Sequence, residues 1–143
     1  CPVLAIPKGC KFRIPKKITF ASDYHKSDIQ AIRFISEWNK TFKAQINILH
    51  IDDREQTIAS EEKLYTKFKR KFEKECENVS ITFQHTEGTD ISKAILEITL
   101  NDKTDILAIS PIKHKGFWNN LFHKSITKTT AYHIRIPLLA IPI

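Results

Sequence analysis

The stretch that decides the fold runs from Asp105 to Ile143 and reads DILAISPIKHKGFWNNLFHKSITKTTAYHIRIPLLAIPI. Apolar runs stand at its two ends, Ile106 to Ile109 and Ile136 to Ile143. Between them lie a basic loop and a segment from Ser125 to His133 that can form a short helix capped by Ser125. A strand, a loop, a helix and a second strand in this order make a βαβ unit, which belongs in a parallel sheet.

This stretch is also basic, because it contains no Asp or Glu from Ile106 onward. In parallel sheets, ligands bind at the carboxyl ends of the strands, near helix N-termini whose free N–H groups favour anions. The sequence therefore predicts an anion-accepting loop. Its basic and histidine residues are Lys113, Lys115, Lys124, Lys128, Arg135, His114, His123 and His133.

The composition indicates one ordered globular domain. The chain has 143 residues, of which 41% are hydrophobic and only 3 are Gly, as is typical of an α/β domain. No apolar run is long enough to span a membrane and the opening does not resemble a secretory signal, so we expect no membrane association. Cys1, Cys10 and Cys76 lack metal-ligand spacing and suit free thiols in a reducing cytoplasm, with a Cys1–Cys10 disulfide as the alternative.

The formal net charge of +7 has two interpretations, a lysine-rich surface or a nucleic-acid-binding face. A face that stacks bases needs aromatic residues among the basic ones, and the aromatics here do not alternate in that way. We therefore predict no nucleic-acid partner.

The two ends of the chain resemble each other, since Cys1 to Pro7 reads CPVLAIP and Ile136 to Pro142 reads IPLLAIP. This near-repeat predicts that the opening segment is the closing strand of a preceding copy, and that the chain is the C-terminal half of a tandem protein. Chance similarity between two apolar strands is the alternative. We assign residues 1–16 to this remnant and a linker, and residues 17–143 to the domain.

Between the ends, strand and helix patterns alternate. We expect strands at Lys17–Ser22, Ala44–Ile51, Val79–His85, Thr104–Ile109 and Ile136–Ile141. We expect helices behind a capping box at Ser27, at Leu64–Cys76, behind an N-cap at Asp90 and at Ser125–His133, and we place Trp38 on the apolar face of the first.

Five strands alternating with four helices predict an α/β fold with a doubly wound, Rossmann-like parallel sheet of strand order 3-2-1-4-5. In this order, a crevice opens between the first and fourth strands. Asp23 and Ser110 both lie at its edge.

Several pieces of the chain stand in an order that is familiar from one family. They are the strand end at Asp23 with Ser27 beyond it, the strand Ile46–His50, the turn Glu87–Asp90 and the closing segment Ile136–Pro142. Together they resemble the universal stress protein family over essentially the whole chain. The resemblance implies an adenine nucleotide alpha hydrolase-like fold and a regulatory role in the stress response. Tandem members are common in that family, in agreement with the near-repeat.

The family's nucleotide-binding members carry a glycine loop after the fourth strand, where the backbone approaches phosphates without a Cβ in the way. The matching places here read Ser110, Lys113 and, with one extra residue, Lys124–Ser125, and only Gly116 remains of the glycines. We therefore predict no ATP binding and no cofactor. The alternative is a site in which the lysines replace the glycines and bind another nucleotide or a phosphate.

The candidate ligand-binding residues are Asp23, Ser110, Lys113, Gly116, Lys124 and Ser125. Asp23 resembles the family residue near the adenine or ribose, or it is a strand-ending carboxylate paired with a lysine. Ser125 is a helix cap or an anion contact. Phe117 and Trp118 cover a ligand, pack on a partner or simply anchor the loop.

Metal and catalytic chemistry have weaker support. His25, His114, His123 and Asp23 could converge as zinc ligands, but their spacing does not require it, and we predict no metal. His50 and His85 end their strands and give no functional signal. No nucleophile stands beside a base at a recognisable spacing, and no Ser lies in a Gly-x-Ser-x-Gly elbow, so we predict that the protein is not an enzyme.

The closing strand is expected at the edge of the sheet, and an uncovered apolar edge invites pairing. We predict that Val3–Ile6 lies antiparallel to Leu138–Ile141, within the chain or across a two-fold axis. In the family this edge forms the dimer contact, so we expect a homodimer or a contact with the preceding domain. The candidate interface residues are Val3, Leu4, Ile6, Leu138, Leu139 and Ile141.

Two functions follow from the sequence. The first is a regulatory stress-response domain that acts through dimerisation or protein partners, without ATP. The alternative is a sensor of a small nucleotide or phosphate ligand, with its basic loop in place of the glycine loop.

Overall fold

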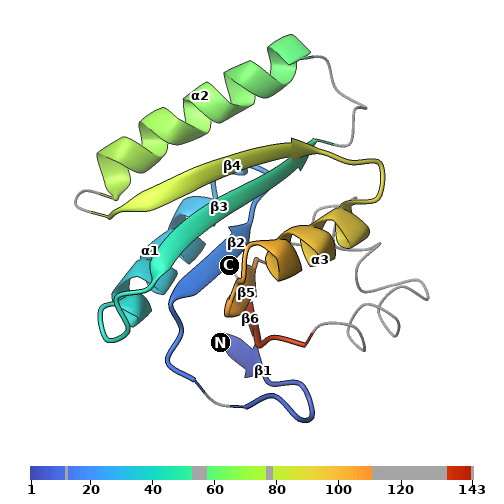
Figure 1. Ribbon diagram of the computed structural model, residues 1–143. Helices are drawn as coiled ribbons and strands as arrows, with labels where there is room; N and C mark the ends of the chain where they lie inside the picture. Colours follow the sequence, from blue (N-terminus) through green and yellow to red (C-terminus); the bar gives the residue numbers. More distant parts are fainter. Residues whose placement is uncertain (12, 53–57, 77–78, 111–134, 143) are drawn as a thin grey trace.

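The computed structural model describes residues 1–11, 13–52, 58–76, 79–110 and 135–142. They form a six-stranded sheet between two layers of helices (Figure 1). The elements in chain order are β1 (Val3–Ala5), β2 (Lys17–Ala21), α1 (Asp28–Asn39), β3 (Gln45–Asp52), α2 (Ile58–Glu75), β4 (Ile81–Glu87), α3 (Ile91–Asn101), β5 (Ile106–Ile109) and β6 (Leu138–Ala140).

The sheet has the strand order β1-β6-β5-β2-β3-β4. Its last five strands are parallel and stand in the order that the sequence predicts. The sheet differs from the predicted one by a sixth strand, because β1 joins its edge. β1 runs antiparallel to β6, with Leu4 opposite Leu139, which confirms the predicted pairing and places it within the chain.

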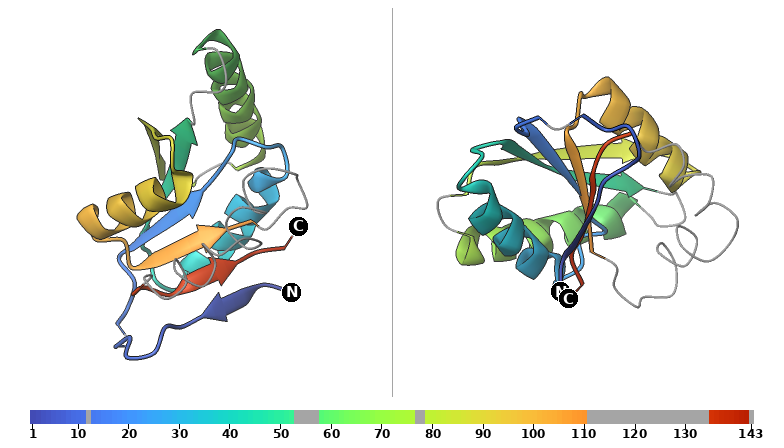
Figure 2. Two further views of the ribbon diagram at one scale, coloured as in Figure 1. Left: turned by 90° about the vertical axis from the view of Figure 1, so that its right-hand side faces the viewer. Right: turned by 90° about the horizontal axis from the view of Figure 1, so that it is seen from below.

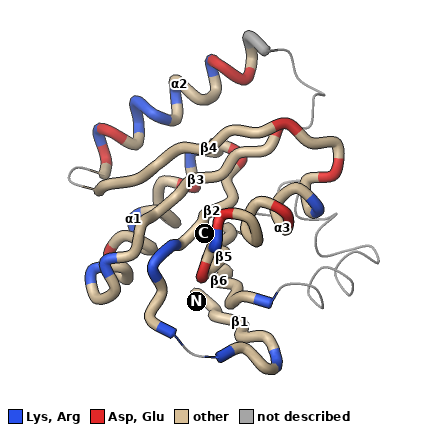
Figure 3. The backbone as a smooth tube through the Cα atoms, viewed as in Figure 1, with Lys and Arg blue, Asp and Glu red and all other residues tan. Residues whose placement is uncertain are grey.

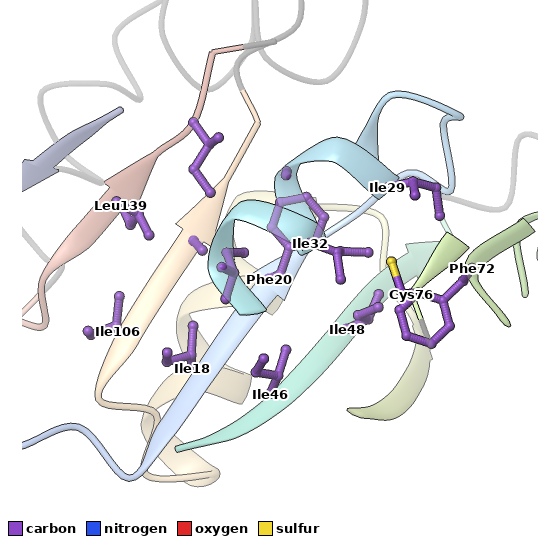
Figure 4. Close-up of a cluster of buried hydrophobic side chains, with 14 of the residues drawn as sticks. Ile18, Phe20, Ile29, Ile32, Ile46, Ile48, Phe72, Cys76, Ile106 and Leu139 are labelled. Atoms are coloured by element: carbon purple, nitrogen blue, oxygen red, sulfur yellow. The ribbon is translucent and has the colours of Figure 1, made fainter. Parts of the chain in front are cut away.

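Both faces of β2, β3 and β5 are buried. Ile18, Phe20 and Ile48 point to the face that α1 and α2 cover, where Ile32 and Phe72 meet them (Figure 4). The residues on the opposite face, among them Ala21, Leu49 and Leu107, pack against α3. Strands that are buried on both sides need continuous apolar runs, which explains why their sequences do not alternate with polar residues.

The helix boundaries differ in part from the predicted ones. α2 begins at Ile58, six residues before Leu64, the first apolar residue by which the sequence marks this helix. Glu62 and Lys63 in its early turns are exposed and Glu61 is buried against His50, while Phe68 and Phe72 supply the buried apolar face. Trp38 is half-buried and packs edge-on against Phe42, with 5.0 Å between ring centroids.

Of the predicted caps, one is confirmed and one is wrong. The Asp90 side chain accepts a hydrogen bond from the Lys93 N–H at 3.0 Å, as an N-cap does. Ser27 makes no such bond to α1, because its hydroxyl is 2.6 Å from Nδ1 of His25. The fourth helix, expected at Ser125–His133, lies outside the described residues.

The linker before β2 is fixed to the sheet through one carboxylate. Asp105 accepts the backbone N–H groups of Lys16 and Lys17 at 2.7 and 3.0 Å, and Nη2 of Arg13 lies 2.8 Å from its other oxygen. The linker therefore turns at the amino end of β5, and β1 runs back along β6. The two chain termini consequently lie close together (Figure 2).

Candidate functional site

A pocket of about 180 Å³ lies at the carboxyl ends of β2 and β3. This is the edge of a doubly wound sheet at which ligands bind. The first turns of α2 and of α3 close it from the sides. Its lining consists of Ala21, Ser22, Asp23, Leu49, His50, Ile51, Glu61, Leu64, Ile91 and Ile95.

His50 is the central polar residue of this pocket. Its ring is buried, with Nδ1 2.8 Å from the Ser22 carbonyl oxygen and Nε2 3.0 Å from Oε2 of Glu61. A carbonyl can only accept, so Nδ1 donates to Ser22. The second contact then needs a further proton, either on Nε2 or on the Glu61 carboxyl. The His50–Glu61 pair thus holds a proton between two buried groups, and both ring nitrogens are satisfied inside the protein.

Tyr24 supports the His50 ring from one side. The two rings stack with 4.2 Å between centroids and 18° between planes. The Tyr24 backbone has a φ of 58°, a left-handed conformation that a bulky residue adopts rarely and that turns its ring back under β3. Burial raises the pKa of the Tyr24 hydroxyl, and the nearby Tyr65 and Glu61 raise it further. Among the described residues, this hydroxyl has no hydrogen-bond partner.

Ser22 joins the end of β2 to the start of α1. Its hydroxyl donates to Oδ2 of Asp28 at 2.6 Å and accepts the Tyr24 N–H at 3.0 Å. Burial raises the pKa of Asp28 to about 7, and the charge of Asp23 adds to this effect, while the Ser22 hydrogen bond opposes it. The polar groups of β2, α1 and β3 therefore bond mainly to one another.

The described carboxyl edge of the sheet is acidic. Asp23 follows β2, Asp52 ends β3 and Glu87 ends β4, and Figure 3 shows the acidic residues at the ends of β3 and β4. Glu61 and Asp28 add two buried carboxyls at the same edge. An edge with this charge disfavours phosphate groups unless basic residues balance it.

The structure brings two of the predicted ligand-binding residues to the same edge. Asp23 is exposed, lines the pocket and accepts the His25 N–H at 3.1 Å. Ser110 follows β5, the neighbour of β2, and is buried without a hydrogen-bond partner for its hydroxyl among the described residues. The other four candidates, Lys113, Gly116, Lys124 and Ser125, lie outside the described residues, as do Phe117 and Trp118.

The sequence prediction missed the most buried polar groups of the site. We assigned no signal to His50, which in the structure bonds to Ser22 and Glu61. A histidine inside the apolar run of a strand buried on both faces was a usable signal, because such a side chain needs a partner. Its partner Glu61 lies on another element, so sequence spacing does not reveal it.

Metal binding and membrane crossing have no support in the described part of the chain. There, no three His, Cys, Asp or Glu side chains gather in a way that could hold a metal ion. His114 and His123 of the predicted zinc set lie outside that part. No described helix is long and apolar enough to cross a membrane. Cys1, Cys10 and Cys76 are all free thiols.

No family model matches the sequence, and no curated protein is similar to it. Solved structures are similar in fold. A universal stress protein from Archaeoglobus fulgidus DSM 4304 has a TM-score of 0.66 and 13% identity over 99% of this chain and 49% of its own. A putative universal stress protein from Pseudomonas aeruginosa UCBPP-PA14 has a TM-score of 0.67 and 18% identity over 99% of this chain and 52% of its own.

A third similar structure is a universal stress protein in complex with cAMP, with a TM-score of 0.63 and 13% identity. It covers 90% of this chain and 98% of its own. This chain thus spans about half the length of the first two proteins and nearly all of the third. At these identities the likeness establishes the fold, which is that of the universal stress proteins.

Proposed function

We propose that the chain is a universal stress protein domain with a regulatory role, which does not bind ATP and acts through dimerisation or protein partners. The observation that carries this proposal is the closed hydrogen-bond network at the carboxyl edge. His50, Ser22 and Asp28 bond to groups of the protein itself, so within the described part of the chain few polar side chains at this edge are left for a ligand.

The size and charge of the pocket agree with this. Its volume of about 180 Å³ is below the range of about 300–1,000 Å³ that is typical of ligand sites. Asp23 and Glu61 line it, and their carboxyls oppose a triphosphate. We propose no enzymatic role, because the sequence pattern offers no nucleophile with its base and the described residues of the site bring none together.

A sensor of a small nucleotide or phosphate ligand remains the second candidate. The Ser110 hydroxyl favours it, because this group is buried without a partner among the described residues and stands where the family's glycine loop begins. One similar structure is a complex with cAMP. In this chain the lysines that follow Ser110 would supply the charge for such a ligand.

Calorimetric titration with ATP and with AMP, each with and without magnesium, tests the proposal. We expect no heat of binding at micromolar concentrations. Binding that is lost in Ile91→Trp, which fills the pocket, and kept in Leu100→Trp, an exposed position of the same helix, would contradict the proposal and favour the sensor. Loss in Lys124→Glu or Ser125→Ala would assign the ligand to the basic loop.

For partners, we propose a contact through the edge that β1 and β6 form, in a homodimer or with a preceding domain. We propose no membrane or nucleic-acid partner. A reducing cytoplasm is the compartment that suits the three free thiols.

A further inference from the structure

The helix α2 has a side that no described element covers. Its apolar residues point to the sheet, where Phe68 and Phe72 are buried and the Phe72 ring lies 5.9 Å from that of Phe83 on β4, between centroids. The helix lies over the β4 end of the sheet, with its opposite side turned away from the strands (Figure 1). In the described structure, that side is open to another molecule.

Four basic residues form a line along this open side. Lys63, Lys67, Arg70 and Lys74 are all exposed. Their intervals of four, three and four residues place them on one side of the helix, over about 16 Å of its length. We call these four residues the basic stripe. Figure 3 shows basic residues recurring along α2.

The charges of the basic stripe are not balanced within the fold. Between described residues, no ion pair involves any of its four side chains. Two carboxylates of the same helix are engaged elsewhere. Glu61 bonds to His50 at 3.0 Å, and Glu75 pairs with Lys71 at 3.6 Å and with Arg33 of α1 at 3.5 Å. Like charges four residues apart on a helix repel each other, so a negative partner would relieve a cost that the free helix carries.

The neighbouring residues argue against two classes of negative partner. Single-stranded nucleic acids need aromatic rings on which their bases stack, and the nearby Tyr65 ring is directed inward, 5.7 Å from that of Phe83. A membrane surface needs an apolar helix face, and that of α2 packs on the sheet. Glu62 and Glu73 each stand one residue before a lysine of the stripe, about 100° around the helix, so both flank the stripe on one side. There they would repel a polymer of uniform negative charge.

A helix with mixed charges fits all of these features. Asp or Glu residues at intervals of four, three and four form a line as long as the basic stripe. Basic residues on the flank of such a helix would meet Glu62 and Glu73. The side chains of the stripe also line a shallow groove, which is formed by α2 alone. Helices pack by fitting rows of side chains into grooves of this kind.

We infer that the basic stripe of α2 is a docking surface for an acidic helix of a partner protein. The inference rests on the proposed action through protein partners and gives the chemistry of one of them. β4, which lies under α2, and β1 stand at opposite ends of the strand order. The helix can therefore dock while the edge that β1 and β6 form is occupied as well.

The test is an NMR titration of the amides of the chain with two alanine-based helical peptides, at about 50 mM salt. The first peptide carries four glutamates at the spacing of the stripe, and the second has the same composition with its glutamates spread around the helix. We expect saturable shifts at the amides of the stripe with the first peptide, and binding at least about fivefold weaker with the second.

Two double variants complete the experiment. Lys67→Gln with Arg70→Gln should weaken binding of the first peptide by about fivefold to tenfold. Lys8→Gln with Lys26→Gln removes the same charge at exposed positions elsewhere and should leave the affinity within about twofold. All four side chains are exposed, so the fold should be retained.

Equal binding of the two peptides, or equal losses in the two double variants, would show that only net charge matters and would overturn the inference. Absence of binding would overturn it too, as would tighter binding of an oligonucleotide of the same charge. Shifts at the stripe that appear on concentrating the chain alone would assign the surface to a second copy instead. Titration with ATP probes the pocket and not α2, so failure of the proposed function and failure of this inference are read from different experiments.

Discussion

The pocket at the carboxyl ends of β2 and β3 and the outer edge of β1 differ in how well their groups are satisfied. In the pocket, the buried His50 bonds to the Ser22 carbonyl, and the Ser22 hydroxyl bonds to the buried Asp28 carboxyl. At the edge, Leu4 directs its backbone groups outward, and its side chain and that of Ile6 are exposed. Of the described polar groups at the pocket and beside it, only the Tyr24 and Ser110 hydroxyls are buried without a partner, whereas the apolar side chains of β1 stand beside an open strand edge, on which another strand can pair. The comparison favours the edge as the contact surface that we propose.

The largest change in stability is expected from shortening Leu139 of β6, which is buried, and a much smaller one from the same change at Leu4 of β1, which is exposed. Leu139→Ala removes a buried side chain of the core and should lower the free energy of unfolding by about 3 kcal/mol. Leu4→Ala, the same change at the corresponding position, should cost less than about 1 kcal/mol in the 143-residue chain. Urea unfolding of both variants measures the difference, and equal losses would contradict the comparison.

In the pocket, removing the partner of His50 should have the next largest effect. Glu61→Leu leaves Nε2 of His50 buried without a partner and should cost about 2 kcal/mol. Glu61→Gln can still bond to a neutral imidazole and should cost less than about 1 kcal/mol. Chemical unfolding of the two variants separates the hydrogen bond from the volume of the side chain. A loss of the same size in both would mean that the closed network has been misassigned.

Asp28 should make the pocket region sensitive to pH. Its pKa of about 7 in the folded protein is above its ordinary value of 3.8. The folded state therefore holds this proton more tightly, and the associated stability is full below about pH 4 and lost as the pH rises through about 7. Asp28→Asn, which can still accept from Ser22, should be more stable than the parent by about 1–2 kcal/mol at pH 8 and similar to it at pH 4.

Thermal unfolding at the two pH values checks this prediction. Glu37→Gln is the control, because its carboxyl is exposed and its loss should change stability little at either pH. A gain for Asp28→Asn that is the same at pH 4 and pH 8 would exclude the buried carboxyl as its cause.

The smallest global effect is expected from proline in β1. Proline at Ala5 removes an N–H that faces β6, and proline at Leu4 removes one that faces outward. Ala5→Pro should raise the exchange rates of the Leu138 and Ala140 amides by about tenfold or more, and Leu4→Pro should raise them less. Faster exchange in Leu4→Pro than in Ala5→Pro would reverse the assigned hydrogen-bond pattern.

Much of the fold could be predicted from the sequence, because apolar runs and helical spacing are local patterns. The run Ile106–Ile109 and the closing segment became β5 and β6, and the near-repeat predicted the antiparallel place of β1. The apolar residues from Leu64 onward marked α2, but its true start at Ile58 was missed, because polar residues such as Glu61 and Glu62 carry no apolar periodicity there. The bond from Ser27 to His25 was missed, since a cap pattern does not reveal a competing side chain.

The site was less predictable than the fold. Asp23 and Ser110 follow adjacent parallel strands, and strand order alone brought them to one edge. The contact between His50 and Glu61 depends on how α2 packs over β3, which no local pattern contains. The raised pKa of Asp28 depends on burial by residues from several elements, so a first-turn carboxylate looks like an ordinary helix-start residue in the sequence.

The most direct measurement is the stability of Leu4→Ala and Leu139→Ala at protein concentrations below and above that at which the chain associates. If a partner copy covers β1, Leu4 becomes buried in the assembly, and the loss for Leu4→Ala should rise from below about 1 toward about 3 kcal/mol, approaching that for Leu139→Ala. If the loss for Leu4→Ala stays below about 1 kcal/mol at every concentration while that for Leu139→Ala remains large, no partner covers the edge and the account is wrong.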